Sequence, residues 1–294
     1  MNKGTVAMIV GMIIVLVLAL VFVFVNIKPG KVVNVDTGRG YDSIQEAISA
    51  NETLDGHTLV ISSGLYRENV EITKSLTVKG QNRDSTVVEH GNRSVIAIRA
   101  MADYSTVANL TVRDSHFGIW CQNSKECKVV GNRVINCITG IRVDTCNNTV
   151  VEGNEVLNGT LSGIHVYWKS FNTTVTGNRI ENLSGDQGYY GAINLESSDR
   201  ITVTYNWVAD GIRGIYMYSS ATNVTVYSNS FSNNIEQVAL DGPARAVWDN
   251  GYPSGGNYWS DYAGTDADGN GIGDTPYTID STNQDRYPLM TSPL

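Results

Sequence analysis

Apolar and polar residues alternate in short pieces through the middle of the chain. Each unit reads as a piece such as NVTVY (223–227), an Asn turn, a pair such as SF (230–231), and a Gly-Ile piece such as GIYMY (214–218). Alternation with a period of two is typical of strands that bury one face. The pattern predicts three short strands, joined by turns, in every unit.

The Gly-Ile piece returns at a nearly constant interval of 22, 23, 29, 22 and 23 residues, at Ile119, Ile141, Ile164, Ile193, Ile215 and Val238. A second series agrees, with steps of 23, 22, 24, 28 and 23 residues: Asn109, Asn132, Asn154, Asn178, Asn206 and Asn229. Both series lengthen where residues 184–191, SGDQGYYG, are inserted. A short fixed period indicates a solenoid. We therefore predict an all-β fold, a right-handed single-stranded parallel β-helix over residues 41–250.

Stacked coils would place equal positions above one another, about 4.8 Å apart. The Asn series is expected to form a ladder, because amides bond along a stack and Asn tolerates the left-handed turn conformation. A solenoid must also cover its ends. Residues 41–49, YDSIQEAIS, predict a short N-terminal capping helix, started by Asp42 or Ser43. Residues 251–294, where the period stops, predict the C-terminal cap.

Several of these segments resemble known families. Residues 41–49 together with residues 55–80, DGHTLVISSGLYRENVEITKSLTVKG, resemble the opening of carbohydrate-related parallel β-helix proteins. The Asn and Gly-Ile repeats resemble the NosD-like family, which is described as periplasmic and copper-binding. The tail over residues 255–290 is similar to the closing segment of NosD-like surface proteins. The resemblance covers about residues 41–290 and implies the fold, which hosts lyases, hydrolases, binding modules and passive stalks alike.

The N-terminus has a different pattern, since residues 5–27 carry no charge. About 20 apolar residues span a bilayer as a helix, and a cleaved signal has a shorter apolar region. We expect an uncleaved signal-anchor over residues 1–27, with cleavage as the alternative, and a linker over residues 28–40. Eight Asn-x-Ser/Thr sites follow, although an Asn/Thr-rich repeat also creates such sites by chance: Asn51, Asn92, Asn109, Asn147, Asn158, Asn172, Asn182 and Asn223. With the anchor, they favour an extracellular or periplasmic body.

Composition narrows the class of partner. Charged residues make up 17% of the chain and the formal net charge is −8, whereas nucleic-acid binding needs clustered Lys and Arg. We expect no nucleic-acid partner. Four cysteines lie close together, and an exported location permits a local disulfide, with buried free thiols as the alternative: Cys121, Cys127, Cys137 and Cys146.

The Gly-Ile strand offers a candidate binding surface. In G-I-x-V-x the apolar residues point inward, so the intervening positions point outward and stack as a stripe on one face of the coil. The outward pairs are Trp120/Gln122, Arg142/Asp144, His165/Tyr167, Asn194/Glu196, Tyr216/Tyr218 and Ala239/Asp241. Aromatic faces stack on sugar rings and polar groups bind hydroxyls. The stripe therefore predicts polysaccharide or glycoconjugate binding, with a passive surface as the alternative.

Catalysis is a further option on the same stripe. Asp144, Glu196 and Asp241 are expected two coils apart, at about 10 Å, which is near the upper limit for an inverting glycosidase. Arg213 is a candidate basic residue. The strand GIRVD (140–144) resembles the strand that carries the acidic calcium site in pectate-lyase-like coils, and the resemblance points to Asp144. No two neighbouring coils both offer acids, so we lean against an enzyme, with lyase or glycoside hydrolase as the alternative.

An Asp-rich loop near the end predicts a structural Ca²⁺ site. Residues 266–274, DADGNGIGD, match the spacing of a calcium loop, with ligands expected at Asp266, Asp268, Asn270, Ile272 and Asp274. Position 12 lacks a bidentate acid, and the alternative is an Asp/Gly turn without metal. Copper sites need clustered His, Met or Cys, and the four histidines are dispersed, so we do not expect copper. The sequence thus predicts a membrane-anchored, glycan-binding β-helix. Structural or copper-maturation roles in the envelope remain alternatives.

Overall fold

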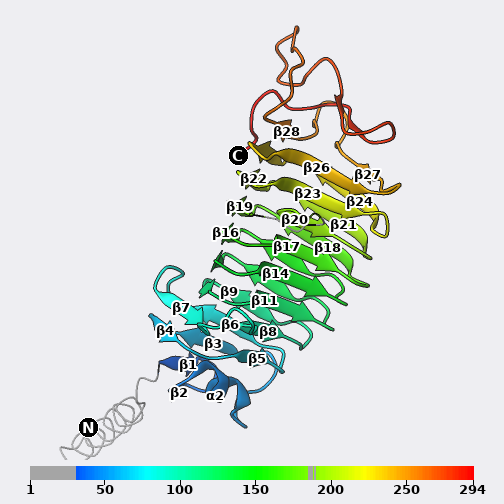
Figure 1. Cartoon of the computed structure of the whole chain (residues 1–294). Helices are drawn as coiled ribbons and strands as arrows, with labels where there is room; N and C mark the ends of the chain where they lie inside the picture. The colour runs from blue at the N-terminus through cyan, green and yellow to red at the C-terminus, as the bar shows by residue number, and fades with distance from the viewer. Residues whose placement is uncertain (1–30, 185–187, 189) are drawn as a thin grey trace, which may run out of the picture.

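The computed structural model describes residues 31–184, 188 and 190–294. Over this part of the chain, short strands wind into a right-handed parallel β-solenoid of about eight turns with little helix. Figure 1 shows the strands stacked along one axis, with the N-terminal strands at one end and the C-terminal loops at the other. The predicted all-β class and parallel β-helix are confirmed.

Among the described residues the strands form three long sheets. Sheet A has eleven strands, in the order β2 (Arg39–Tyr41), β1 (Val32–Asn34), β3 (Thr58–Ile61), β6 (Thr77–Gly80), β9 (Thr106–Ala108), β12 (Lys128–Val130), β15 (Val150–Glu152), β18 (Phe171–Thr176), β21 (Asp199–Thr204), β24 (Thr222–Tyr227) and β27 (Ala246–Val247). Sheet B has nine, β28 (Tyr258–Trp259), β25 (Ser230–Ser232), β22 (Trp207–Ala209), β19 (Arg179–Glu181), β16 (Glu155–Leu157), β13 (Arg133–Ile135), β10 (Thr111–Arg113), β7 (Thr86–Glu89) and β4 (Gly64–Tyr66). Sheet C has eight, β26 (Glu236–Asp241), β23 (Arg213–Tyr218), β20 (Ile193–Leu195), β17 (Ser162–Tyr167), β14 (Thr139–Asp144), β11 (Phe117–Gln122), β8 (Ile98–Ala100) and β5 (Val70–Ile72). Each regular coil therefore contributes one strand to each sheet.

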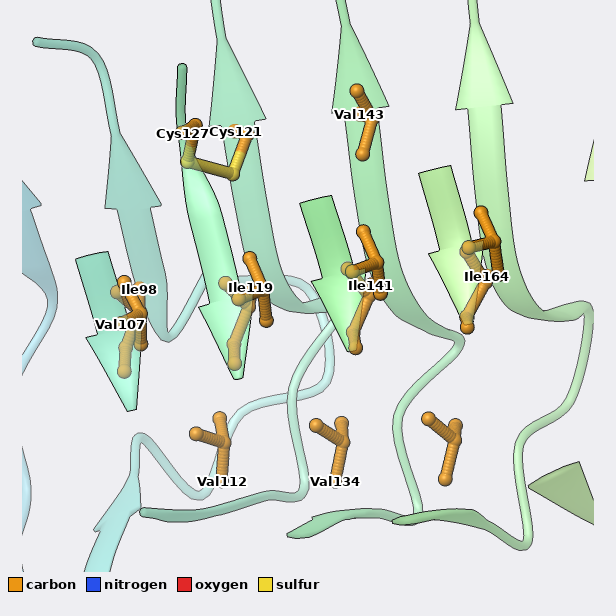
Figure 2. Packing of buried hydrophobic residues seen from close by; sticks show 14 of the residues in the cluster. Ile98, Val107, Val112, Ile119, Cys121, Cys127, Val134, Ile141, Val143 and Ile164 are labelled. Atoms are coloured by element: carbon orange, nitrogen blue, oxygen red, sulfur yellow. A yellow bond between two sulfur atoms is a disulfide. The ribbon is translucent and has the colours of Figure 1, made fainter. Parts of the chain in front are cut away.

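The core consists of stacked rows of β-branched residues. In sheet C, Ile98, Ile119, Ile141 and Ile164 pair in register on successive strands and are fully buried. Figure 2 shows this row beside valines from the other strands. Because alternate residues of a strand point to opposite faces, these rows fill the coil and leave the intervening positions outside. The predicted alignment of the Gly-Ile pieces is confirmed through Val238.

Glycine precedes the stacked isoleucine because neighbouring coils approach closely there. A Cβ on Gly140 would lie 2.6 Å from the carbonyl oxygen of Gly163 in the next coil and 2.5 Å from Val156 Cγ1. Gly118 and Gly214 meet the same obstacle, at 2.7 and 2.6 Å from the carbonyl oxygen of the next coil. The close approach explains the Gly-Ile motif.

A buried ladder of asparagines runs along the turn between sheets A and B. Each backbone N–H donates to the Oδ1 of the next asparagine, and each Nδ2 donates to the same Oδ1 and to a carbonyl of the preceding coil. The members are Asn132, Asn154, Asn178, Asn206, Asn229 and Asn257. The predicted ladder is confirmed from Asn132 to Asn229, and it continues to Asn257.

Asn109 does not belong to this ladder, so the prediction is wrong at its first member. Leu110 takes the ladder position, and its N–H donates to Asn132 Oδ1 at 3.1 Å. Asn109 has a φ of 56°, in the left-handed region. The glycines that precede later ladder members are also left-handed, such as Gly131 with a φ of 64°. The left-handed residue is thus the one before the ladder asparagine.

Left-handed corners also explain most of the Asn-x-Ser/Thr sites. Five of the eight asparagines have φ between 51° and 57°: Asn109, Asn158, Asn172, Asn182 and Asn223. Asn tolerates this conformation better than other residues with a side chain, and a β-branched residue suits the strand that follows. The geometry of the corners therefore explains the asparagine at these five sites.

The N-terminal end is covered by helix α2 (Ile44–Ser49). Ser43 is the N-cap and accepts from the N–H of Glu46, and the stripe of Ile44, Ala47 and Ile48 is buried, as predicted. The prediction of a linker over residues 28–40 is wrong from Val32 onward. Strand β1 pairs antiparallel with both β2 and β3, and Val32 is buried in the first coil, so this segment belongs to the fold.

The C-terminal end is closed by aromatic rings. Trp259 stacks on Phe231 at 4.7 Å and on Tyr277 at 4.5 Å between ring centroids, and so continues the inner row of sheet B beyond its last full coil. Strand β28 extends parallel pairing to Trp259, past residue 250. A two-stranded antiparallel sheet, β29 (Tyr277–Thr278) and β30 (Gln284–Asp285), follows.

The cysteines divide between the two predicted states. Cys121 and Cys127 form a disulfide, which Figure 2 shows, whereas Cys137 and Cys146 are buried free thiols. Burial raises the pKa of the Cys137 thiol to about 12. Cys146 packs beside Ser124 of the neighbouring coil.

The predicted signal-anchor over residues 1–27 lies outside the described residues. Within residues 31–184, 188 and 190–294, no helix has the length and apolar character needed to cross a membrane.

Candidate functional site

The outer face of sheet C carries two columns of outward side chains. The first column is in register from strand to strand: Arg99, Trp120, Arg142, His165, Asn194, Tyr216 and Ala239. The second column lies two residues further along each strand: Gln122, Asp144, Tyr167, Glu196, Tyr218 and Asp241. The sequence-predicted stripe therefore exists as one continuous face.

The first column is more enclosed than the sequence suggested. The relative exposure of His165 is 2%, that of Asn194 is 0% and that of Tyr216 is 6%. The expectation that His165 is a surface residue is wrong. Its neighbours cover it, since the rings of Tyr167 and Tyr190 lie 5.2 and 6.1 Å from the imidazole.

Arg142 occupies the aromatic part of this face. Its guanidinium carbon lies 4.1 Å from the ring centroid of Tyr167, 5.2 Å from Phe117 and 5.9 Å from Trp120. A cation over an aromatic face is attracted by the ring quadrupole. Part of the predicted sugar-stacking surface is therefore used to hold an arginine.

The protonation of His165 follows from its neighbours. Arg142 Nη1 lies 3.4 Å from His165 Nδ1, and because a guanidinium only donates, Nδ1 must accept. The ring proton is then on Nε2, which lies 3.4 Å from Glu196 Oε2 without the geometry of a hydrogen bond. Burial lowers the pKa of His165 against the opposing effect of Glu196, and the nearby Arg142 charge lowers it further. His165 is therefore a neutral imidazole whose N–H lies on the side of Glu196.

The candidate catalytic carboxylates are spaced as predicted but have ordinary partners. Asp144, Glu196 and Asp241 lie on β14, just after β20 and on β26, so two strand spacings, or about 10 Å, separate successive members. Asp144 accepts from Thr145 and lies 3.5 Å from Arg142. Arg213 is paired with Glu236 at 2.9 Å. Burial raises the pKa of Tyr218, and the charge of Glu196 adds to that shift.

Four residues of this face were missed by sequence reasoning. Arg99 and Glu71 extend the first column below Trp120, and the pair Ala97-Ile98 is the signal for Arg99, since Ala replaces Gly before the stacked Ile. Phe117 and Tyr190 lie outside the G-I-x-V-x pattern, in a strand start and in the inserted segment. Only the folded chain brings them to Arg142 and His165.

Sheet B has an outer face of a different kind. Glu89 accepts from Arg67 at 3.1 Å and from Arg113 at 2.7 Å, and Glu155 accepts from Arg133 at 2.6 Å. The charges of these residues are therefore paired along the stack.

The Asp-rich loop forms a turn that satisfies its own carboxylates. Asp266 accepts from the backbone N–H groups of Asn270 and Gly271, and Asp268 also accepts from Asn270. Asp274 accepts from Thr265 Oγ1 and the N–H of Ala267. The N–H of Ile272 donates to Asn270 Oδ1. The calcium site stays a prediction.

Metal-ligating side chains do not gather elsewhere in the described ranges. No three His, Cys, Asp or Glu residues there form a group that could hold a metal ion. His57 bonds to Asn34 and to the N–H of Leu54, and the cysteines are buried or in a disulfide. These residues do not fit a copper ion.

Comparison with protein families gives one match over most of the chain. The family described as periplasmic copper-binding protein (NosD) matches residues 50–264. A cell surface glycoprotein of Methanothermus fervidus is 25% identical over 322 aligned residues, which cover 78% of this chain and 53% of that protein. A probable ABC transporter binding protein NosD of Pseudomonas aeruginosa is 30% identical over 159 residues, covering 49% of this chain and 36% of that protein. The chain spans about half or less of the length of these curated relatives.

Solved structures give weaker likenesses. An alginate lyase from Paenibacillus has a TM-score of 0.46 and 10% identity, covering 69% of this chain and 93% of that one. The catalytic domain of an α-1,3-glucanase in complex with nigerose has a TM-score of 0.45 and 15% identity, covering 74% of this chain and 45% of that one. At these scores the likenesses carry no inference about activity.

Proposed function

The chain belongs to the NosD family, and from that premise we propose that it binds a polysaccharide or glycoconjugate outside the cytoplasm. The binding face is the outer face of sheet C, from Trp120 to Asp241. The family's description as periplasmic and the name of the cell surface relative support the location. The apolar run at residues 5–27 would anchor the protein in the membrane.

One observation carries the proposal: the two columns of sheet C are in register over six successive strands. A repeating face of rings, amides and carboxylates at the strand spacing suits a ligand that itself repeats along a chain. Sheet B, by contrast, pairs its outer charges internally.

A glycan array tests the proposal. We expect the purified protein to bind a defined set of glycans, and Tyr218→Ala to weaken that binding about tenfold. Tyr227→Ala is the matched control, because Tyr227 is a partly exposed tyrosine on sheet A. Absence of binding to any glycan, or equal losses in both variants, would contradict the proposal.

A second candidate is hydrolysis or lytic cleavage of the same glycan. Glu196 lies about 10 Å from Asp144 and from Asp241, near the upper end of the range of about 6.5–9.5 Å that supports inverting hydrolysis. Incubation with bound glycans should then release reducing ends or unsaturated products, and Glu196→Gln should abolish the release. If no product forms after prolonged incubation, the protein binds the glycan without cleaving it.

The third candidate is a structural or copper-maturation role in the envelope. The described residues do not fit copper, so no step of the proposed function involves it. Tight copper binding in a titration, together with no binding to any glycan on the array, would favour this role over glycan binding.

A further inference from the structure

Buried N–H donors without a partner gather on the glycan-binding face. Nine buried side-chain nitrogen or oxygen atoms of the described residues have no hydrogen-bond partner, and five of them lie on five successive strands of sheet C. These five are Trp120 Nε1, Arg142 Nε, His165 Nε2, Asn194 Nδ2 and Arg213 Nη1. Leaving such a group buried and without a hydrogen-bond partner is unfavourable. The face therefore has a requirement for acceptor oxygens.

The orientation of Asn194 makes this requirement specific. Its side chain is fully buried, and its Oδ1 accepts from the N–H of Gly191 at 2.7 Å. That bond fixes the amide so that Nδ2 is the free end. The ring of His165 is fixed in a comparable way, because Arg142 donates to Nδ1 and the ring proton is then on Nε2.

The charges of the face argue against an anionic ligand. Each arginine has its own carboxylate: Arg99 lies 3.7 Å from Glu71, Arg142 lies 3.5 Å from Asp144, and Arg213 lies 2.9 Å from Glu236. Among the described residues, Glu196 and Asp241 have no Lys or Arg within ion-pair distance. Because His165 is neutral, two negative charges remain uncompensated on the face.

A column of donors therefore lies beside a column of acceptors. On the strand that leads to Glu196, the Asn194 donor and the Glu196 acceptor are two residues apart, or about 7 Å along the strand. A sugar hydroxyl accepts one hydrogen bond and donates another, so it can satisfy both columns. A carboxylate or sulfate would satisfy the donors but would face the uncompensated Glu196 and Asp241.

We propose that the ligand of this face is a neutral, hydroxyl-rich glycan and not a uronate or sulfated one. The inference rests on the proposed function and specifies its substrate class. The glycan lies along the coil axis, where its oxygens accept from Arg142, His165 and Asn194, and its hydroxyls donate to Glu196 and Asp241. Since the donors are buried, the proposal requires that the rings that cover His165, those of Tyr167 and Tyr190, move when the glycan binds.

The test uses the strongest array binder in two forms that differ at one position, with C6 either a primary alcohol or a carboxylate. Calorimetry should show at least tenfold tighter binding of the alcohol form, with less than a twofold change between 50 and 500 mM NaCl, since salt screens only charge interactions. Glu196→Gln removes a charge and an acceptor and should weaken binding about threefold to tenfold. Glu152→Gln, an exposed carboxylate on sheet A, is the matched control.

Four outcomes separate the inference from the proposed function on which it rests. Tighter binding of the carboxylate form, or tighter binding by Glu196→Gln than by the wild-type protein, overturns the inference and leaves glycan binding intact. Equal affinity for both forms also overturns it. No binding of any array glycan overturns the proposed function, and the inference with it.

Discussion

At the scale of single residues, buried polar side chains determine both the fold and its weak points. Asn178 shows the principle. It is 1% exposed, its Oδ1 accepts from the backbone and side chain of Asn154, and its Nδ2 donates to the carbonyl of Val151. The ladder thus replaces the turn's missing backbone partners with side chains.

We expect Asn178→Ala to lower the free energy of unfolding by about 3 kcal/mol, because it leaves the N–H of Asn154 and the carbonyl of Val151 buried and unpaired. Urea denaturation measures the change. Asn51→Ala, at an exposed turn, is the control and should change it by less than about 0.5 kcal/mol. A loss at Asn178 no larger than at Asn51 would show that the ladder contributes little.

The ladder ends at a carboxyl group whose protonation is linked to stability. Asp285 is fully buried and accepts from the N–H groups of Asn257 and Tyr287 and from Trp259 Nε1. Burial raises its pKa to about 6 against the opposing effect of these donors, and the charge of Asp249 contributes in the same direction.

The sign of the pH dependence follows from this shift. Between about pH 4 and pH 6 the folded protein holds a proton that the unfolded chain has released, so stability falls as pH rises, by up to about 3 kcal/mol. We expect Asp285→Asn to flatten the dependence of Tm on pH between 4.5 and 7.5. Asp249, whose pKa is lowered mainly by its bonds with Arg286, acts at lower pH. The same slope in the variant would contradict the assignment.

At the scale of elements, the approach of one coil to the next determines which residues a strand accepts. Gly140→Ala would place a Cβ within 2.6 Å of the Gly163 carbonyl oxygen, so we expect a loss of at least about 2 kcal/mol by overpacking. Gly64→Ala is the control, because its nearest atom lies at 3.5 Å in ordinary contact. Thermal denaturation of both variants measures the difference in stability. A stable Gly140 variant would mean that the coils can separate.

The Asp-rich loop is the element for which the metal prediction remains to be tested. If it binds Ca²⁺, saturating calcium should raise Tm by several degrees relative to a chelator, because a ligand of the folded state stabilises it by mass action. Asp268→Asn should remove the response while keeping the turn's Asn270 contact. An identical wild-type Tm in calcium and in chelator would favour the metal-free turn that the hydrogen bonds already form.

At the scale of the whole molecule, the sequence predicts what depends on the repeat. Ile141 aligns with Ile164, and Arg142 with His165, because a period-two pattern repeated every 22 or 23 residues leaves one register that buries the apolar face. The capping helix was predictable for a similar local reason, since Ser43 and the stripe of Ile44 and Ile48 are sufficient signals.

What the sequence could not predict depends on contacts between different coils. His165 lies against Tyr190, which comes from an insertion with no repeat position. Arg142 lies over the rings of Phe117 and Tyr167, which are on neighbouring strands. No local sequence pattern predicts these contacts. The ladder position of Leu110 was missed because Asn109 stands beside it and fits the spacing nearly as well.

The most direct test of the account is hydroxyl-radical footprinting of the protein with and without the strongest array glycan. We predict protection of Tyr167 and Tyr218 on sheet C, and unchanged labelling of Tyr227 on sheet A and Tyr205 at a corner. Protection of Tyr205 or Tyr227 with no change on sheet C would contradict the assignment of the glycan to this face.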